Sequence, residues 1–542
     1  MSFDGLGYMD AQHYMNKGIM PNLQEFQQEA AYATDFVTVM PSLTAPSHAA
    51  MATGARPAAT GIVSNEFHSQ GKKLKDDQSG FSQTLGVTPI WKEAKNQGKV
   101  TATVAFPDSN PNNSSSSATY AVYSGGTLAE SALHDLKFSS VKDERARHLF
   151  SKSIEAEEAV VTLDIKDYPT QQLFVLRTVE KQPKLYISTD PNNVGEEISV
   201  DDWNAVVLDI PYFDSSGLYI KLKGDISKKE GLQMFQGTVM GGIYRGRDDF
   251  SKKIESEFGF YPAADELKAF SSGTITREEY EQAGERFTDW VTDVSLYIKY
   301  TYRPDLLFYY YPTVDTELHE FLLREPAQPG YDLAAVQEKE KYVSWAFGQV
   351  DKVIGSIKRN QKSDDHLLLI SDHGLEPIHT RLSPNVELEK AGLLVKDKEG
   401  KIDSSKTKAY AEASGTLAHI YVNLKGREKQ GIVEPSEFDQ VTQEIVSAFT
   451  NRPVFSPLYR DPRKAANPVF KWLNGKKDTV YKGKAYPNLT MFSSDQEEVT
   501  PYEVIWSDKD DEYASISNGN SGDVFLSAAP GFLMGKDANI SL

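Results

Sequence analysis

The sequence contains no cysteine, which excludes disulfide bonds and thiolate metal ligands. Any bound metal must therefore be held by Asp, Glu or His side chains or by hydroxyl groups. No apolar run approaches the roughly 20 residues that a membrane-spanning helix needs. The first ten residues also lack the charged segment and apolar stretch of a signal peptide, so we expect the chain to begin inside the fold.

Basic charge is scarce relative to acidic charge. The sequence has 58 Lys and Arg residues against 77 Asp and Glu residues, a formal net charge of −19. This balance argues against a nucleic-acid polymer as partner, because binding its backbone needs a basic surface. A small anionic substrate stays compatible, since bound divalent cations reverse the local field of an active site. The composition and net charge do not predict an oligomeric state.

The 542 residues are too many for one ordinary core, which favours a large domain with an insertion, or two to three domains. Strand and helix patterns alternate through residues 1 to about 110. We predict strands at Phe36–Met40 and Val100–Phe106 and helices at Ser47–Thr53 and Trp91–Gln97. Such alternation predicts an α/β domain with a largely parallel sheet.

From about residue 120 to 250 the pattern becomes strand-rich, and we interpret this region as an inserted β-rich cap. The alternating pattern returns near Phe287, with a long helix over 333–358 and a strand at His366–Ile370. The predicted organisation is a split core, 1–119 and 251–542, with the cap at 120–250. The strands expected in the cap are Val160–Ile165, Gln172–Leu176, Val206–Ile210 and Leu218–Leu222.

Two pairs of metal-type residues follow predicted strands, where ligands bind in open α/β sheets. The strand at 366–370 ends just before Asp372 and His373, and an ordinary alternative is a capping Asp beside a surface His. Leu306–Tyr311 leads to Asp315 and His319. Four residues is one helical turn, so these two side chains can bind one ion, although a surface ion pair fits the same spacing.

Two further segments carry candidate site residues, but each is a weaker indication of a site when taken alone. Thr44, followed by Pro46, opens an Ala-rich helix, and a hydroxyl with a nearby proline is common at helix starts. The free N–H groups and dipole of the same helix start would also stabilise a phosphoryl group and a threonine alkoxide. Asp4 with Gly5, at the start of the chain, is by itself only a turn.

Together these residues resemble, in order and spacing, the type I phosphodiesterase and nucleotide pyrophosphatase family of the alkaline phosphatase superfamily. The resemblance covers residues 1 to about 110 and 290 to 380, is poor in the insertion and is loose after about 425. It implies an alkaline-phosphatase-like α/β fold, a largely parallel sheet sandwiched by helices. It rests on Asp4-Gly5, Thr44 with Pro46 and His48, Thr53-Gly54, Gly61-Ile62-Val63 with Asn65, Asp315 with His319, and Asp372-His373-Gly374.

The resemblance also implies two divalent metal ions, expected to be zinc. Asn65 would contact the phosphoryl group and Tyr310 would face the substrate, although the run Tyr309–Tyr311 also fits a core strand. We interpret His48 as structural. Two residues would belong to the second ion: Asp315 and His319. Four would hold the first ion: Asp4, Thr44, Asp372 and His373.

The family pattern has one more histidine for the second ion, well after the Asp372 motif. This sequence has no histidine beyond His419, which lies inside the apolar strand predicted at Ser414–Val422. We expect His419 to be structural. Gly522–Ala528 resembles the strand that precedes the absent histidine, so we expect an incomplete second site and a chain trimmed at both ends.

The expected activity is hydrolysis of a small phosphoric ester, as a phosphodiesterase or nucleotide pyrophosphatase. Metal coordination would activate the Thr44 hydroxyl, and in-line displacement would give a phosphothreonine intermediate. The resemblance implies a secreted or cell-surface location. Alternatives are a phosphomonoesterase or phosphonate hydrolase on the same metal site, or a non-catalytic family member that lacks one metal ligand.

Overall fold

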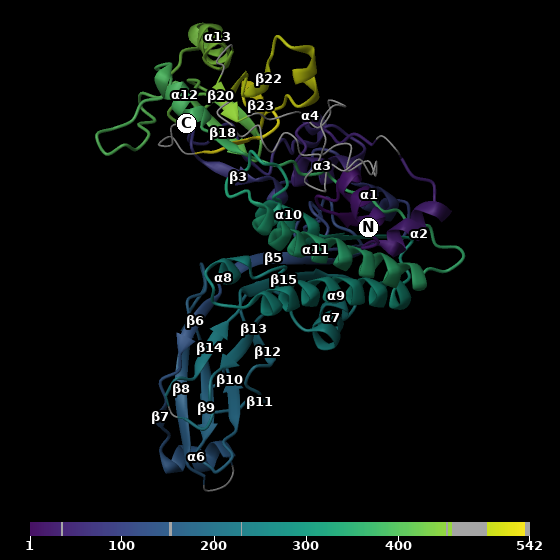
Figure 1. Ribbon diagram of the computed structural model, residues 1–542, viewed down its shortest axis with the longest axis vertical. Helices are drawn as coiled ribbons and strands as arrows, with labels where there is room; N and C mark the ends of the chain where they lie inside the picture. The colour runs from purple at the N-terminus through teal and green to yellow at the C-terminus, as the bar shows by residue number, and fades with distance from the viewer. Residues whose placement is uncertain (34–35, 151–153, 229, 451–453, 458–495, 537–542) are drawn as a thin grey trace. The chain divides into compact units, whose positions relative to one another are not determined.

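The computed structural model describes residues 1–33, 36–150, 154–228, 230–450, 454–457 and 496–536 (Figure 1). The chain divides into two compact units. One comprises Met1–Gln97, Phe106–Asp108 and Tyr310–Leu542, and the other Gly98–Ala105 and Ser109–Tyr309. Among the described residues, no helix combines the length and apolar character needed to cross a lipid bilayer.

Strand β1 (Ser2–Phe3) organises the sheet of the first unit. It pairs in parallel with Tyr310–Tyr311, the end of β16 (Leu306–Tyr311). Ser2 also forms a parallel bridge with Ile370, and the Phe3 N–H donates to the Ile370 carbonyl at 2.9 Å. All three segments therefore run the same way, so their carboxyl ends meet at one edge. The strand predicted at His366–Ile370 is only partly right, because Ile370 alone forms a bridge.

Helix α3 (Thr44–Thr53) ends at Gly54, whose φ of 68° only glycine adopts readily. It confirms the predicted helix and starts three residues earlier. The strand predicted at Phe36–Met40 is wrong. Residues 36–40 form no ladder, and Phe36 and Val37 are 64% and 81% exposed. Alternating apolar residues form a strand only where another strand pairs with them.

After α3 come α4 (Pro57–Thr60), a hairpin of β2 (Glu66–His68) and β3 (Asp77–Ser79), and α5 (Ile90–Asn96), which confirms the helix predicted there.

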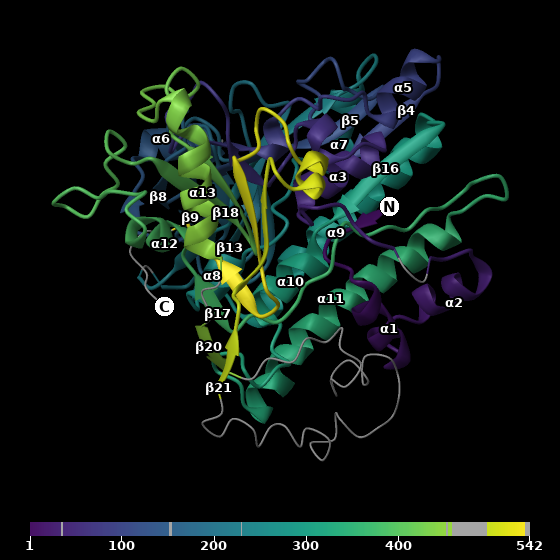
Figure 2. The ribbon, with the colours of Figure 1, turned by 90° about the horizontal axis from the view of Figure 1, so that it is seen from above.

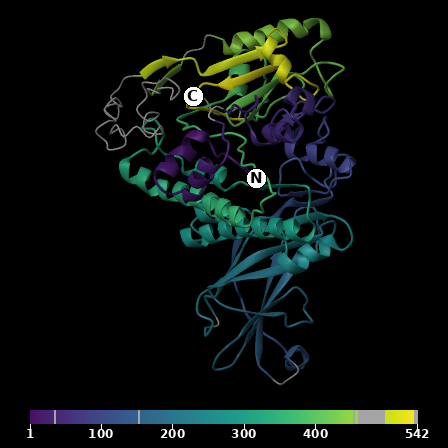
Figure 3. The ribbon, with the colours of Figure 1, turned by 90° about the vertical axis from the view of Figure 1, so that its right-hand side faces the viewer.

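Helices α1 (Tyr8–Asn16) and α2 (Pro21–Glu29) pack beside α11 (Leu333–Arg359), as Figures 1 and 3 show. The Asp351 carboxylate on α11 accepts the N–H groups of Asn22 and Leu23 at 3.2 and 2.8 Å. These are free donors of the first turn of α2, so one buried carboxylate caps this helix from another. The long helix predicted at 333–358 is confirmed.

The rest of the first unit contains a four-stranded antiparallel sheet in the order β18-β19-β23-β22. Helix α13 (Phe438–Phe449) lies beside these strands in Figure 2 and shares their apolar core through Val441, Ile445 and Phe449. The strands predicted around His419 and at Gly522–Ala528 are confirmed as β19 and β23. The remaining bounds are β18 (Ala409–Ser414), β19 (Leu417–Val422), β22 (Tyr502–Ser507), β23 (Val524–Ala528), α12 (Pro384–Lys390) and the pairs β17 (Thr380–Leu382) with β24 (Phe532–Met534) and β20 (Val454–Pro457) with β21 (Gln496–Val499).

In the second unit, β4 (Thr101–Val104) pairs in parallel with Leu306–Tyr309 of β16 and with β5 (Tyr120–Ala129). An antiparallel extension follows. Together these pairings confirm an α/β fold with a largely parallel central part and added antiparallel strands. The extension consists of β15 (Val239–Arg245), β13 (Ser215–Lys223), β14 (Gln233–Gln236) and β6 (Ala132–Asp135), with β12 (Trp203–Leu208) paired to β13.

A separate antiparallel sheet occupies the end of this unit, where Figure 1 shows β8, β9 and β10 side by side. The strands predicted between residues 120 and 250 are all present, while the assignment of this region to a cap stays a prediction. The bounds are β7 (Ser139–Ser140), β8 (Ala156–Leu163), β9 (Gln171–Thr178), β10 (Leu185–Ser188), β11 (Glu196–Ile198), α6 (Asp143–Phe150), α7 (Phe250–Phe258), α8 (Leu267–Ser271) and α9 (Arg277–Thr301).

Candidate metal and phosphoryl site

Three predicted metal ligands converge at the edge where β1 and the 366–370 segment end. Asp4, Asp372 and His373 each present one ligand atom, and these atoms lie within 4.8 Å of one another. The His373 Nε2 is 3.5 Å from Asp4 Oδ1 and 3.3 Å from Asp372 Oδ2. It is also 3.4 Å from the Thr44 hydroxyl oxygen. The structure thus brings together all four residues expected around the first ion.

Each carboxylate of this cluster has one fixed oxygen and one without a hydrogen-bond partner. Asp372 Oδ1 accepts the N–H groups of Gly5 and His373 at 3.1 and 3.0 Å, and Asp4 Oδ2 accepts the Tyr310 hydroxyl. Asp4 Oδ1 and Asp372 Oδ2 are buried and accept no hydrogen bond. A buried carboxylate oxygen is costly without a partner, so the two free oxygens suit a cation.

The spacing around His373 Nε2 also suits a tetrahedral ion. For zinc, with ligand bonds of about 2.0–2.1 Å, neighbouring ligand atoms of a tetrahedron lie about 3.3–3.4 Å apart. The three distances from His373 Nε2 to Asp372, Thr44 and Asp4 are 3.3, 3.4 and 3.5 Å. The distances from His373 Nε2 to its three neighbours are therefore those expected between ligands of one divalent cation.

The electrostatics of the cluster agree with this fit. Burial raises the pKa of Asp4 well above its usual range, and the negative charges of Asp372 and Asp315 raise it further. Carboxylates that are buried together in this way keep a proton unless a cation compensates their charge. Metal binding would therefore release a proton from this site.

Thr44 is the first residue of α3, so its hydroxyl lies at the positive end of a helix. Asn65 lies beside it, because its Oδ1 accepts the N–H of Ala45 at 2.8 Å. His48 lies one turn further along α3. Its Nδ1 donates to the Thr44 carbonyl and its Nε2 accepts from the Ser2 hydroxyl, both at 2.8 Å. These contacts agree with a structural role for His48.

Residues 1–539 match the family model described as type I phosphodiesterase / nucleotide pyrophosphatase. The chain belongs to this family. It is thus a member of a family of phosphodiesterase and pyrophosphatase hydrolases, as the motifs around Asp4, Thr44, Asp315 and Asp372 predict.

Similarity to individual proteins is more limited. A 114-residue stretch of this phosphodiesterase family member is 30% identical to the bis(5'-adenosyl)-triphosphatase enpp4 of Xenopus laevis, and it covers 20% of this chain and 24% of that protein. The structure of phosphonoacetate hydrolase from Sinorhizobium meliloti aligns with 99% of this chain. The alignment covers 81% of the hydrolase chain, at 11% sequence identity and a TM-score of 0.41. Murine ectonucleotide pyrophosphatase / phosphodiesterase 5 aligns with 99% of this chain and 80% of its own length, at 11% sequence identity and a TM-score of 0.42.

The two residues expected at a second ion lie on α10 (Thr313–Phe321), which follows β16 directly. His319 Nε2 is 3.4 Å from Asp315 Oδ1, so both side chains share one helix face, as predicted. A Cβ at Gly5 would lie 2.9 Å from the Asp315 Cα, so α10 packs closely on the Asp4-Gly5 turn. Among the described residues, no third His, Asp or Glu completes a ligand group with this pair.

Both ring nitrogens of His419 are hydrogen-bonded to backbone groups in this family member. Its Nε2 donates to the Val63 carbonyl at 3.0 Å, and its Nδ1 accepts the Gly522 N–H at 3.1 Å. Burial lowers the pKa of His419 to about 4, so the ring is neutral. With both nitrogens bonded to backbone groups, His419 is structural, as the sequence indicates.

The hydrogen bond between Tyr310 and Asp4 was not predicted from the sequence. The Tyr310 hydroxyl donates to Asp4, and the Tyr310 ring meets His48 edge-on with 5.2 Å between ring centroids. The side chain therefore orients a predicted metal ligand, while its contact with substrate stays a prediction. The Ser2 contact with His48 was also missed, because nothing in a lone serine before Asp4 signals it.

We predict that zinc titration by calorimetry will show one tight and one weak site per chain. The weak site is the Asp315 and His319 pair, because two protein ligands are fewer than zinc sites generally use. Asp315 raises the pKa of His319 above its ordinary value of 6.5, so a proton competes with the metal there even near neutral pH. Binding at this site should weaken as pH falls, and two equally tight sites would contradict the assignment.

Proposed function

We propose that this chain is a metal-dependent phosphoric ester hydrolase, acting as a phosphodiesterase or nucleotide pyrophosphatase, with Thr44 as its nucleophile. The observation that supports this most directly is the position of the Thr44 hydroxyl. It lies 3.4 Å from His373 Nε2, which is itself 3.5 Å from Asp4 Oδ1 and 3.3 Å from Asp372 Oδ2, two buried oxygens that have no hydrogen-bond partner. A hydroxyl in such a place is poised for activation rather than for a structural contact.

Asp4, Asp372 and His373, with Thr44, would hold the first cation, and Asp315 and His319 would contribute to a second. Bound divalent cations would stabilise negative charge on the phosphoryl oxygens and favour the alkoxide form of a nearby hydroxyl. The protein fixes this arrangement through groups around the ligands. Gly5 orients Asp372 through a backbone N–H, and Tyr310 orients Asp4 through its hydroxyl.

In the proposed reaction the Thr44 oxygen, having lost its proton, attacks phosphorus and displaces the ester or phosphoanhydride oxygen in line. A phosphothreonine results, and water then releases the phosphate product and restores the hydroxyl. The start of α3 would stabilise charge that develops on the phosphoryl oxygens. Asn65 would contact the phosphoryl group, since its side chain is fixed against Ala45, the next residue after Thr44.

We predict that bis-p-nitrophenyl phosphate will be hydrolysed with a kcat/KM at least about tenfold above that of p-nitrophenyl phosphate. A tenfold ratio corresponds to about 1.4 kcal/mol of additional transition-state binding, which one well-placed leaving-group contact supplies. Zinc-loaded protein and initial rates of p-nitrophenol release are the measurement. A preference for the monoester would instead assign the chain as a phosphomonoesterase.

Two further proposals concern specificity and location. We propose that residues 120–250 select the leaving group, so a chain with this region exchanged for that of a relative should change its ratio of diester to pyrophosphate hydrolysis.

We also propose a secreted or cell-surface location, which family membership alone supports. Activity confined to the cytoplasmic fraction of expressing cells would contradict it.

A further inference from the structure

An arginine of α9, in the second unit, stacks on two aromatic rings and has no anionic partner. The guanidinium carbon of Arg286 is 3.8 Å from the centre of the Tyr219 ring and 4.6 Å from that of the Trp203 ring. With the residues that the structure describes, this guanidinium forms no hydrogen bond and no ion pair. Stacking covers the faces of a guanidinium and leaves the N–H donors at its edge. The donors of Arg286 are therefore not taken up by protein groups.

Neighbouring contacts hold both of these rings in place. Trp203 Nε1 donates to Gln282 Oε1 on α9 at 2.8 Å, and Phe235 meets Trp203 edge-on with 5.8 Å between ring centroids. The Tyr219 ring centroid lies 5.0 Å from that of Phe260. A side chain that stacks on fixed rings has already lost much of its rotamer freedom. It therefore loses less conformational entropy when it binds a ligand.

The charge of Arg286 is partly withdrawn from water and poorly compensated. Its side chain is partly buried, and this burial lowers the pKa of Arg286 below its ordinary value. The carboxyl group that acts on it is Glu266, whose two oxygens accept the N–H and the hydroxyl of Thr238 at 2.7 and 2.9 Å. Burial raises the pKa of Glu266 to about 7, so this carboxyl is only partly ionised near neutral pH. Because an arginine keeps its charge, an anion from solution would compensate it.

The ion pairs next to Arg286 leave positive charge in excess. Glu279 on α9 is shared by two lysines of β13, with Lys221 Nζ at 3.2 Å and Lys223 Nζ at 2.8 Å. Lys221 Nζ also lies 5.5 Å from the centre of the Trp203 ring on which Arg286 stacks. Even with the partly ionised carboxyl counted, cations exceed anions in these contacts, although the whole chain has a net charge of −19. A local excess of this kind attracts a dianion more than a monoanion.

The sheet face on which Arg286 stacks has exposed positions next to the two rings. Helix α9 lies next to β12 and β13 (Figure 1), and Ala205 of β12 pairs with Tyr219 of β13. Side chains two residues apart on a strand share a face, so Ala205 and Val207 lie on the face that carries Trp203. Both are exposed, Val207 at 54%. A ligand from solution can therefore reach this face, and its apolar part can cover these two side chains.

We propose that Arg286 is the centre of an oxyanion site in the second unit, which binds the phosphate group of inorganic phosphate or of a phosphate monoester. The planar guanidinium donates parallel N–H bonds to two oxygens of one phosphate group. The local excess of positive charge favours the phosphate dianion over a carboxylate. None of the residues expected to bind metal takes part, so phosphate binding here needs no metal and does not depend on the proposed function.

Calorimetric titration of the chelator-treated chain with inorganic phosphate tests the site. We expect saturable binding in wild type and at least about tenfold weaker binding in Arg286→Gln, which removes both the charge and the paired donors. Arg286→Lys keeps the charge alone and should also bind more weakly than wild type. The matched control is Arg277→Gln on the same helix. Arg277 Nε donates to Glu281 at 2.7 Å, and this variant should bind phosphate as wild type does.

Two further probes identify the anion in the same titration. Phenyl phosphate should bind more tightly than inorganic phosphate if the site takes a phosphate monoester, because its ring can cover Ala205 and Val207. Equal affinity would assign the site to inorganic phosphate. Acetate at matched ionic strength should bind at least about tenfold more weakly than phosphate. Acetate that binds as tightly as phosphate would overturn the assignment to a phosphate group.

Thermal unfolding checks that the variants fold and gives an independent readout. Phosphate should raise the thermal midpoint of chelator-treated wild type and Arg277→Gln more than that of Arg286→Gln, because its nonspecific stabilising effect is common to all three proteins. If Arg286→Gln shows no cooperative transition, Arg286→Lys takes its place in both measurements. A wild type without saturable phosphate binding, or equal phosphate affinity in wild type and the Arg286 variants, would overturn the proposal and leave Arg286 a structural role. A fully active Thr44→Ala would refute the proposed function without changing this comparison.

Discussion

Thr44→Ala is expected to lower diesterase turnover by about 10⁴-fold or more while leaving the fold intact. The hydroxyl is the only group proposed to form a bond to phosphorus, and removal of a nucleophile leaves only binding and electrostatic contributions. The loss of stability should stay within about 1 kcal/mol, because a small side chain at the site surface is truncated. Rates with bis-p-nitrophenyl phosphate and a thermal midpoint measured in parallel test both parts.

Thr53→Ala provides the matched control at the other end of the same helix. The Thr53 hydroxyl donates to the Ala49 carbonyl at 2.7 Å and has no contact with the metal cluster among those described. Its loss should leave the rate within about twofold of wild type. Thr44→Ser should retain part of the activity, because it keeps a hydroxyl on the same backbone. Wild-type turnover in Thr44→Ala would show that the nucleophile lies elsewhere.

Local signals predicted the elements that carry the site. Helix α3, strand β16 with α10 after it, and α11 each follow from a periodic pattern with recognisable ends. The pattern failed where an element depends on a distant partner. Phe36–Met40 alternates as a strand should but finds no pairing strand, and most of His366–Ile370 is extended beside β1 without forming a ladder. Pairing partners are set by the tertiary fold, which periodicity does not contain.

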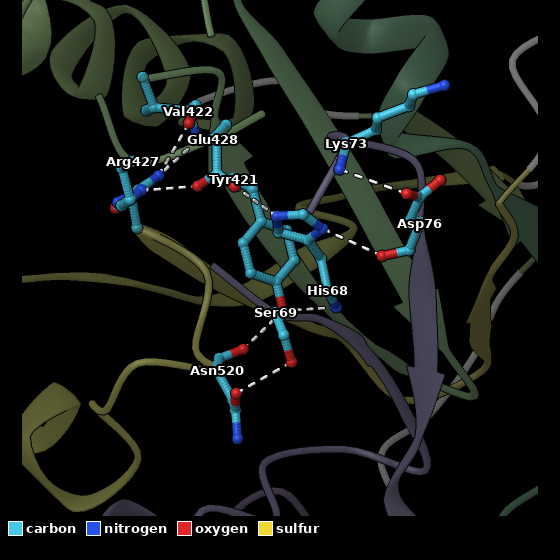
Figure 4. Close-up of polar contacts among 10 residues, drawn as sticks. His68, Ser69, Lys73, Asp76, Tyr421, Val422, Arg427, Glu428 and Asn520 are labelled. Atoms are coloured by element: carbon cyan, nitrogen blue, oxygen red, sulfur yellow. Dashed lines mark hydrogen bonds and ion pairs between the residues drawn. The ribbon is translucent and has the colours of Figure 1, made fainter. Parts of the chain in front are cut away.

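The same division holds within the candidate site. Asp372 and His373 were predictable, because a strand end places adjacent ligands where ligands bind in α/β folds. The hydroxyl of Tyr310 on Asp4, 306 residues away in the chain, was not. Nor was the pairing of His68 with Glu428, which are 360 residues apart (Figure 4). In neither pair do the two members belong to one local motif, so only the fold reveals that the two meet.

Asp372→Asn is expected to remove one metal ion per chain and to lower diesterase activity by more than about 100-fold. In wild type, Asp372 Oδ1 accepts two backbone N–H groups while Oδ2 faces the cluster. An Asn side chain must turn its NH₂ either toward those N–H donors or toward the cation, and either choice loses a required acceptor. Loss of a direct ligand should exceed the 10–100-fold typical of residues that only support ligands.

The control for a buried aspartate is Asp351→Asn. Asp351 also accepts two backbone N–H groups, from Asn22 and Leu23, but it caps α2. Its replacement should cost about 1–3 kcal/mol of stability and leave metal content unchanged. Metal analysis after gel filtration, alongside diesterase rates, distinguishes the two variants. Full metal content in Asp372→Asn would remove Asp372 from the ligand set.

The pH dependence of the metal-free protein gives a second readout of the same substitution. The raised pKa of Asp4 means that its contribution to stability is complete below the ordinary carboxyl value of about 3.9 and is lost as pH rises through the raised value. The thermal midpoint of chelator-treated wild type should therefore fall as pH rises from about 4. Burial is the larger cause of this pKa shift and the charge of Asp372 the next, so Asp372→Asn should flatten the fall without abolishing it.

In wild type, added zinc should reverse the trend, because the cation compensates both carboxylates and binds better once their protons have left. A midpoint that zinc raises equally in wild type and in Asp372→Asn would show that the metal binds elsewhere.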